Sequence, residues 1–136
     1  DGVSALTTAA ATDHCACVRV LLAMPGITVD DMGARVTPLW HACRTGCMQC
    51  ALNLLASGAD PEARGLDDYT CLHAAVLGNN ASVVQVLLSL QPSLAACATN
   101  TSTPLHAAAS NKNEALCRAL IAAGASRWAV DADGAT

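Results

Sequence analysis

Short apolar stripes alternate with polar, turn-rich segments along the chain, and this alternation predicts pairs of short helices. In the second such pair, Leu39, Ala42 and Cys43 fall at i, i+3 and i+4, until Gly46 permits a break. The stripe that follows ends in two leucines and contains Cys47, Cys50, Ala51, Leu54 and Leu55. Gly58 then suits a left-handed C-terminal cap. The pattern predicts two antiparallel helices, the first only about two turns long.

The start of the first helix of this pair is marked by Thr37 and Pro38. A threonine hydroxyl at the N-cap can accept an orphan backbone N–H, and proline suits the first helical position, where a missing N–H costs nothing. The segment 59–69 is rich in Asp, Pro and Gly, which disfavours helix and favours an extended excursion with a turn. Helices this short are marginal alone, so each pair must bury its apolar face against its neighbours.

One short phrase recurs at a constant interval and divides the chain into equivalent units. It begins at Ser4, Thr37, Thr70 and Thr103, so each occurrence lies 33 residues after the one before. The same step relates four alanines, Ala9, Ala42, Ala75 and Ala108, and four apolar pairs, Leu21-Leu22, Leu54-Leu55, Leu87-Leu88 and Leu120-Ile121. We therefore expect repeats at about 1–31, 32–64, 65–97 and 98–130, with 131–136 opening a further one.

The repeated phrase resembles that of the ankyrin repeat family. The best match is Thr37-Pro38-Leu39-Trp40-His41-Ala42 with Gly58-Ala59-Asp60, whereas the first unit departs at Pro25-Gly26 and the third at Gln91-Pro92. The resemblance covers the whole chain. It implies an all-α, ankyrin-repeat solenoid, in which stacked antiparallel helix pairs are joined by extended β-turn or hairpin excursions. We expect residues 1–136 to form a single domain, and the repeat phrase at each end indicates an excerpt from a longer protein.

Composition and charge argue against a membrane or nucleic-acid partner. Hydrophobic residues make up 53% of the chain and aromatic residues 2%, so the core must consist of Ala, Leu, Val and Cys. No apolar run approaches the ~20 residues that cross a bilayer, so no membrane association is expected. The formal net charge is -4 and the seven basic residues are scattered. This argues against a nucleic-acid partner, which needs clustered Lys and Arg.

Most of the eight cysteines fall where the helical pattern wants a small apolar residue, which favours reduced thiols and an intracellular, cytoplasmic location. The cysteine spacing also suggests two other roles. Cys43, Cys47 and Cys50 could bind zinc with nearby histidines, but the second ligand pair would have to be Cys15-x-Cys17, and Cys17 is equivalent to the core position of Cys50. Cys47-x-x-Cys50 has redox-dithiol spacing and could open a helix, which would lower a thiol pKa, but it lacks the strand-helix context. We expect neither a metal nor a cofactor.

Nothing in the sequence indicates catalysis or a small-molecule substrate. His73 and His106 follow the repeat rather than a site, and the resemblance implies that they hydrogen-bond to backbone and brace adjacent repeats. No Ser-His-Asp or Cys-His arrangement and no phosphate loop is suggested. The expected function is a non-catalytic protein-protein interaction module. The alternative is a substrate-receptor segment of a ubiquitin ligase or signalling enzyme whose other domains lie outside this chain.

The resemblance also implies which residues line a concave partner surface, namely the tips of the excursions and the ends of the first helices. Carried over by position, the candidates are Val36, Arg44, Thr45, Leu66, Asp67, Tyr69, Leu77, Asn100, Ser102, Ser110 and Asn111. Tyr69 suits an anchor, although it could instead pack on the neighbouring hairpin. All acidic residues except Asp13 and Glu114 lie in excursions, which predicts a basic patch on a partner that contacts residues 60–69. The alternative is that aspartate merely suits turns.

Overall fold

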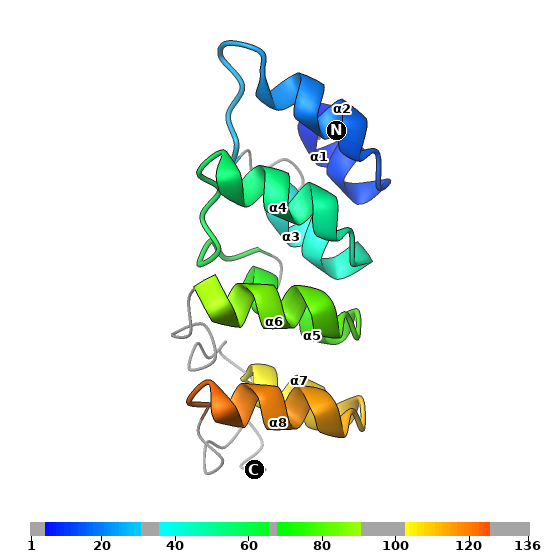
Figure 1. Cartoon of the computed structure of the whole chain (residues 1–136), viewed down its shortest axis with the longest axis vertical. Helices are drawn as coiled ribbons and strands as arrows, with labels where there is room; N and C mark the ends of the chain where they lie inside the picture. Colours follow the sequence, from blue (N-terminus) through cyan, green and yellow to red (C-terminus); the bar gives the residue numbers. More distant parts are fainter. Residues whose placement is uncertain (1–4, 31–35, 66–67, 91–102, 126–136) are drawn as a thin grey trace.

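Four consecutive helix pairs make up the part of the chain that the computed structural model describes, which is residues 5–30, 36–65, 68–90 and 103–125 (Figure 1). Every connection within a pair is short. The helices in chain order are α1 (Ala5–Ala11), α2 (Cys15–Leu22), α3 (Pro38–Thr45), α4 (Met48–Ala56), α5 (Cys71–Leu77), α6 (Ala81–Leu90), α7 (Pro104–Ser110) and α8 (Glu114–Ala122).

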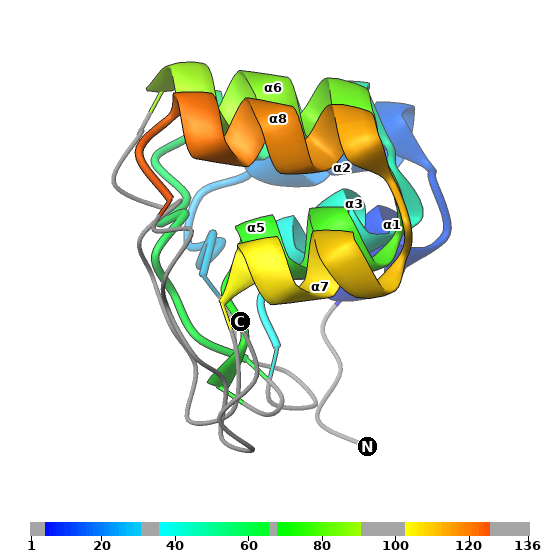
Figure 2. The same ribbon diagram turned by 90° about the horizontal axis from the view of Figure 1, so that it is seen from below.

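The helices form two layers. The first helix of each pair packs on the first helix of the next, so α1, α3, α5 and α7 form one layer, and α2, α4, α6 and α8 form the other (Figure 2). Each pair also packs internally, as α1 on α2 and α3 on α4. This arrangement confirms the predicted all-α stack of antiparallel helix pairs. In the described part of the chain, no helix combines the length and hydrophobicity that a bilayer crossing requires.

The predicted start and stop signals occupy the predicted places. The Thr37 hydroxyl accepts the Trp40 N–H at 3.2 Å, and Pro38 is the first residue of α3. Gly46 ends this helix at φ 82°, and Gly58 follows α4 at φ 94°. Both glycines adopt the left-handed conformation that the sequence predicts at helix ends.

The two histidines brace the starts of their own helices. The N–H groups of Thr70 and Thr103 donate to the Nδ1 atoms of His73 and His106, at 3.3 and 3.2 Å. Each imidazole therefore satisfies a backbone donor that would otherwise lack a partner at the helix start. The hydrogen bond to backbone is as expected, but both bonds lie within one unit and do not join adjacent repeats.

The turn inside each pair is left-handed in all four units. It centres on Asp13, Gly46, Asn79 and Lys112, each 33 residues after the previous one, with φ of 62, 82, 60 and 56°. Only one of the four is glycine, although a side chain is disfavoured in this region. The backbone geometry of the turn is therefore fixed by the repeat rather than by the residue type.

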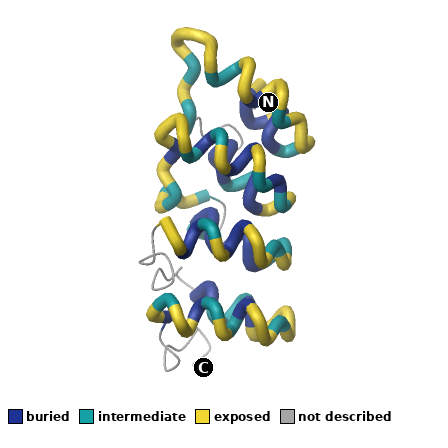
Figure 3. The backbone as a smooth tube through the Cα atoms, in the orientation of Figure 1, coloured by how far each residue is buried: buried dark blue, intermediate teal, exposed yellow. Residues whose placement is uncertain are grey.

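The core runs continuously between the two layers (Figure 3). Leu54 and Leu87 are fully buried and Leu88 nearly so, whereas Leu55 is half-buried. Cys50 is buried as predicted, but Cys17 is exposed. The prediction that Cys17 is a core residue is wrong, because Cys50 is covered by the preceding unit, through the contact of α4 with α2, and Cys17 lies on the outer face of the first unit.

Candidate functional site

We call the layer of α1, α3, α5 and α7 the inner layer and the layer of α2, α4, α6 and α8 the outer layer. The ends of three inner-layer helices carry a row of predicted partner-binding residues. Arg44, Leu77 and Ser110 occupy equivalent positions near the C-terminal ends of α3, α5 and α7, which pack on one another in that order. Arg44 and Ser110 are exposed and Leu77 is half-buried. The structure therefore places these three residues on adjacent helices.

Thr45 and Asn111, each one residue after a member of this row, already hydrogen-bond to backbone carbonyls. The Thr45 hydroxyl donates to the backbone oxygens of His41 and Ala42 at 3.0 and 3.2 Å, and the Asn111 amide donates to the Val76 carbonyl at 2.8 Å. The Asn111 contact ties α7 to α5. Both residues remain exposed, so they present atoms to solvent while part of their hydrogen-bonding capacity is already used.

Val36 is not available to a partner. Its side chain is only 1% exposed and lies against the next excursion, where a Cβ added to Gly65 would come within 2.7 Å of the Val36 Cγ1. The sequence placed Val36 on an exposed tip because it precedes the Thr37-Pro38 helix start. The prediction is wrong because the second excursion, which contains Gly65, covers the Val36 side chain.

Tyr69 is half-buried rather than freely exposed. Its ring stacks on the His73 imidazole, with the ring centroids 5.1 Å apart and the planes 4° from parallel. This packing restricts the side chain and leaves one part of it accessible. Four other candidates, Leu66, Asp67, Asn100 and Ser102, lie outside the described residues.

Three of the four described acidic residues in the excursions accept a hydrogen bond, namely Asp30, Asp60 and Asp68. The Asp30 carboxylate accepts the Asp60 N–H at 3.1 Å, which joins the first two excursions. Asp60 in turn accepts the Glu62 N–H at 2.9 Å, and Asp68 pairs with Arg64 at 3.0 Å. Asp60 and Glu62 are nevertheless exposed. The Asp60 carboxylate therefore shapes a turn and also leaves negative charge on the surface.

Three cysteines and one aspartate converge where the first unit meets the second. The Cys15 Sγ is 2.7 Å from the Cys47 Sγ and 2.7 Å from the Cys50 Sγ, and it is 3.5 Å from the Asp13 Oδ1. One ligand-type atom from each of the four residues lies within 4.8 Å of the others. We call these four residues the thiol cluster.

The sequence analysis did not predict the thiol cluster, because it considered metal ligands as pairs of cysteines close together in sequence, such as Cys15 and Cys17. Cys15 joins the cluster while its neighbour Cys17 does not, since successive residues on a helix point in different directions. The available signal was the interval between units. Residues 32 to 35 apart, such as Cys15 with Cys47 and with Cys50, become neighbours when one unit stacks on the next.

Two thiols of this junction, those of Cys47 and Cys50, are held in the neutral form. Burial raises the pKa of Cys47 from 9.0 to about 11, assisted by hydrogen bonds with Asp13 and Cys15. Burial likewise raises the pKa of Cys50. Hydrogen bonding by Cys47 lowers the pKa of Asp13. A redox dithiol needs a lowered thiol pKa, so the helix start at Cys47 does not produce the reactive thiolate that this alternative required.

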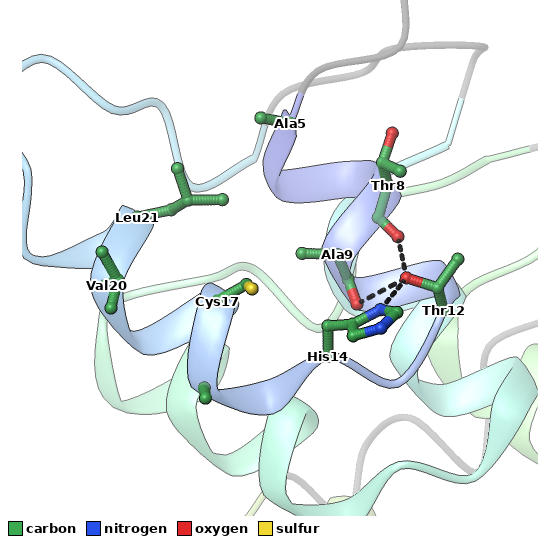
Figure 4. Close-up of a pocket in the computed structure, with 9 residues that line it drawn as sticks. Ala5, Thr8, Ala9, Thr12, His14, Cys17, Val20 and Leu21 are labelled. Atoms are coloured by element: carbon green, nitrogen blue, oxygen red, sulfur yellow. Dashed lines mark hydrogen bonds between the residues drawn. The ribbon is translucent and has the colours of Figure 1, made fainter.

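A shallow groove of about 840 Å³ lies between α1 and α2 (Figure 4). Cys17, Val20 and Leu21 line it on the α2 side, and Ala5 and Ala9 on the α1 side. Its lining is almost entirely apolar, and Val20 is 64% exposed. Cys50 and Leu54, which are equivalent to Cys17 and Leu21, are fully buried one unit later.

Comparisons with known proteins agree with the geometry. The family model "Ankyrin repeats (3 copies)" matches residues 1–65 and 59–131. The chain is 33% identical over 123 residues to the mouse (Mus musculus) RelA-associated inhibitor, covering 88% of this chain and 15% of that protein. It is 36% identical over 104 residues to mouse Ankyrin repeat and SOCS box protein 5, covering 76% of this chain and 31% of that protein. The chain spans less than a third of either relative, and it belongs to the ankyrin repeat family.

Proposed function

We propose that this chain is a non-catalytic protein-binding module whose partner docks along the inner layer of helices and the adjoining excursions. The row of Arg44, Leu77 and Ser110 carries the proposal. These residues recur once per unit, lie at the ends of stacked helices, and differ in chemistry from one unit to the next. A constant backbone with variable exposed side chains suits recognition of one particular partner.

The partner is proposed to be basic where it meets the second excursion. Asp60 and Glu62 are exposed there, and the formal net charge of the chain is -4. A negative edge raises the rate of encounter with a positive patch, and salt weakens this effect. The half-buried Tyr69 beside it supplies a restrained ring for contact.

The inner-layer assignment is tested with two matched charge reversals. The partner is first captured from source cells and identified by mass spectrometry. Arg44→Glu should then weaken its binding about tenfold, because the residue lies in the proposed interface. Arg19→Glu makes the same change at an exposed site on outer-layer α2 and should bind as wild type does. If only Arg19→Glu impairs binding, the assigned face is wrong.

The charge of the partner is tested separately. Glu62→Lys in the excursion should lower the association rate, with a loss that shrinks as salt is raised. Glu114→Lys, at an exposed acid on outer-layer α8, is the control. Surface plasmon resonance at low and high salt measures both rates. Equal association rates for the two variants would contradict a basic partner at this edge.

A second candidate function is that the module is the substrate-receptor segment of a ubiquitin ligase. The observation that favours it is the similarity to a protein named for its ankyrin repeats and SOCS box. The parent protein, isolated with its bound partner, should then support ubiquitin transfer to that partner, and Arg44→Glu should weaken transfer in step with its weaker binding. Binding without transfer would favour a simple interaction module.

Free thiols at every described cysteine support an intracellular, cytoplasmic setting for either function.

A further inference from the structure

The thiol cluster combines residues from both sides of the first junction between units. Asp13 lies in the left-handed turn between α1 and α2, and Cys15 is the first residue of α2. Cys47 is the N-cap of α4, and Cys50 lies in its first turn. One carboxylate oxygen and three sulfurs therefore lie within 4.8 Å of one another. They come from the turn and α2 of the first unit and from the start of α4 in the second.

We propose that Asp13, Cys15, Cys47 and Cys50 bind a zinc ion that fastens the first unit to the second. Three thiolates and one carboxylate complete a four-coordinate set, and Zn²⁺ takes both ligand types at tetrahedral sites. Because all four ligands come from the protein, the site is closed and structural rather than catalytic. This departs from the sequence-based expectation of metal-free cysteines.

The distances suit such a site after a small adjustment. Tetrahedral Zn²⁺ with the usual bond lengths separates two sulfurs by about 3.8 Å, and a sulfur from an oxygen by about 3.6 Å. The Cys15 Sγ is already 3.5 Å from the Asp13 Oδ1, whereas it is 2.7 Å from the other two sulfurs. Binding the ion therefore requires the sulfurs to move apart by about 1 Å. Cys15 is only half-buried, so its side chain has room to move.

The surroundings also suit a metal site. The Cys50 N–H donates to the Cys47 Sγ at 3.3 Å, which supports negative charge on that sulfur and fixes its position. Both residues lie at the start of α4, where the helix dipole favours negative ligands. Burial keeps their thiols neutral in the metal-free chain, so binding of the ion must release these protons. Cys50 is fully buried, while Asp13 is exposed. The ion therefore has an entry path and a dry inner wall.

The same positions in the other units show that the repeat itself does not require these residues. Cys15 is equivalent to Met48 and Ala81, and Cys47 is equivalent to Asn80 and Asn113. Only Cys50 has apolar equivalents throughout, Val83 and Leu116, and so could be explained by packing alone. Among the described residues, the four ligands occur together only at the first junction.

Cobalt binding to the reduced 136-residue chain is the first test, because Co²⁺ reports both thiolate ligation and tetrahedral geometry in its absorption. We expect one Co²⁺ per chain, thiolate charge-transfer bands, and displacement by one equivalent of Zn²⁺. Zinc should also raise the thermal unfolding midpoint, since an ion that binds only the folded chain stabilises it. Absence of binding, or an octahedral spectrum without charge transfer, would overturn the proposal.

Matched variants locate the site. Cys15→Ala and Cys47→Asn introduce residues that equivalent positions of this chain already carry, so both should fold, which circular dichroism checks. Each should weaken metal binding by more than about tenfold. Cys17→Ser removes an exposed thiol two residues from Cys15 and should leave binding unchanged. Equal losses in all three variants would mean adventitious thiol binding and overturn the site.

A disulfide is the competing fate of the cluster. With glutathione disulfide as oxidant, two cysteine thiols would form one S–S bond, lose two hydrogens and release two glutathione molecules. If zinc occupies the site, mass spectrometry should show no such two-hydrogen loss at Cys15, Cys47 or Cys50 when the zinc-loaded chain is incubated with glutathione disulfide. Rapid formation of a Cys15–Cys47 or Cys15–Cys50 disulfide in the presence of zinc would overturn the proposal in favour of a redox pair.

Discussion

The first and second junctions between units use equivalent positions for different chemistry. At the second junction, the Asn80 amide donates to the carbonyl oxygens of Cys43 and Arg44 at 2.9 and 3.2 Å. Its side chain packs against Gly46, where a Cβ would come within 2.5 Å of the Asn80 Oδ1. At the first junction the equivalent residue is Cys47, whose sulfur meets Cys15 instead.

The difference shows that the repeat fixes which backbone positions of two units come into contact. It does not fix which side-chain interaction forms there. An amide that satisfies two helix-end carbonyls is a self-contained contact. A thiol at the same place gives a contact whose strength depends on protonation state and on available metal. The two junctions of one stack should therefore respond differently to substitution, to zinc and to pH.

The largest effect is expected from breaking the core that both junctions share. Leu87 on α6 is 1% exposed, so Leu87→Ala should lower the free energy of unfolding by about 2 to 5 kcal/mol. Leu90→Ala, on the same helix at a side chain 62% exposed, should change it by less than about 0.5 kcal/mol. Denaturant unfolding measures both. Equal effects would show that the layer assignment of α6 is wrong.

The contrast between the junctions is sharpened by truncating equivalent residues. Asn80→Ala leaves two carbonyls without their donor and should cost about 1 to 2 kcal/mol. In chelator, Cys47→Ala should cost less, because its neutral thiol makes weaker hydrogen bonds. With zinc present the order should reverse, if the proposed site holds. Unfolding midpoints of both variants, with chelator and with zinc, test this ordering, and an order that zinc leaves unchanged would contradict it.

The smallest expected effect is a loss of stability at alkaline pH that arises at the first junction. The folded chain holds the Cys47 proton more tightly than the unfolded chain, because burial raises this pKa to about 11. The contribution is complete below the ordinary pKa of 9.0 and is lost as the pH rises toward 11. Unfolding midpoints in chelator, measured across this range, should fall less steeply for Cys47→Asn than for wild type. Parallel curves would assign the loss to other groups.

The fold followed from sequence because its signals are local and repeated. Thr37, Pro38, Gly46 and Gly58 each specify a helix boundary from within a few residues, and the 33-residue step repeats the pattern. The candidate surface depended on contacts between units. Burial of Val36 beneath the next excursion could not be read from its own neighbours in sequence.

The thiol cluster escaped prediction for a related reason. Cys17 and Cys50 occupy equivalent positions, which suggested equivalent burial, yet burial at this position requires a preceding unit to cover it. Cys15, not Cys17, contributes a thiol to the cluster. Only the orientation of α2 against α4 distinguishes these two cysteines. Periodicity predicts which backbone positions recur, but contacts between side chains of adjacent units need the three-dimensional stack.

The left-handed turn inside each pair bears on the order in which the chain folds. Gly46 adopts this conformation without steric penalty, so the second turn can form before its helices dock. Lys112 has no such preference, and its turn becomes favourable only when α7 and α8 are already packed together. The turn of the second unit is thus more locally encoded than that of the fourth, and we expect the second unit to form earlier during folding.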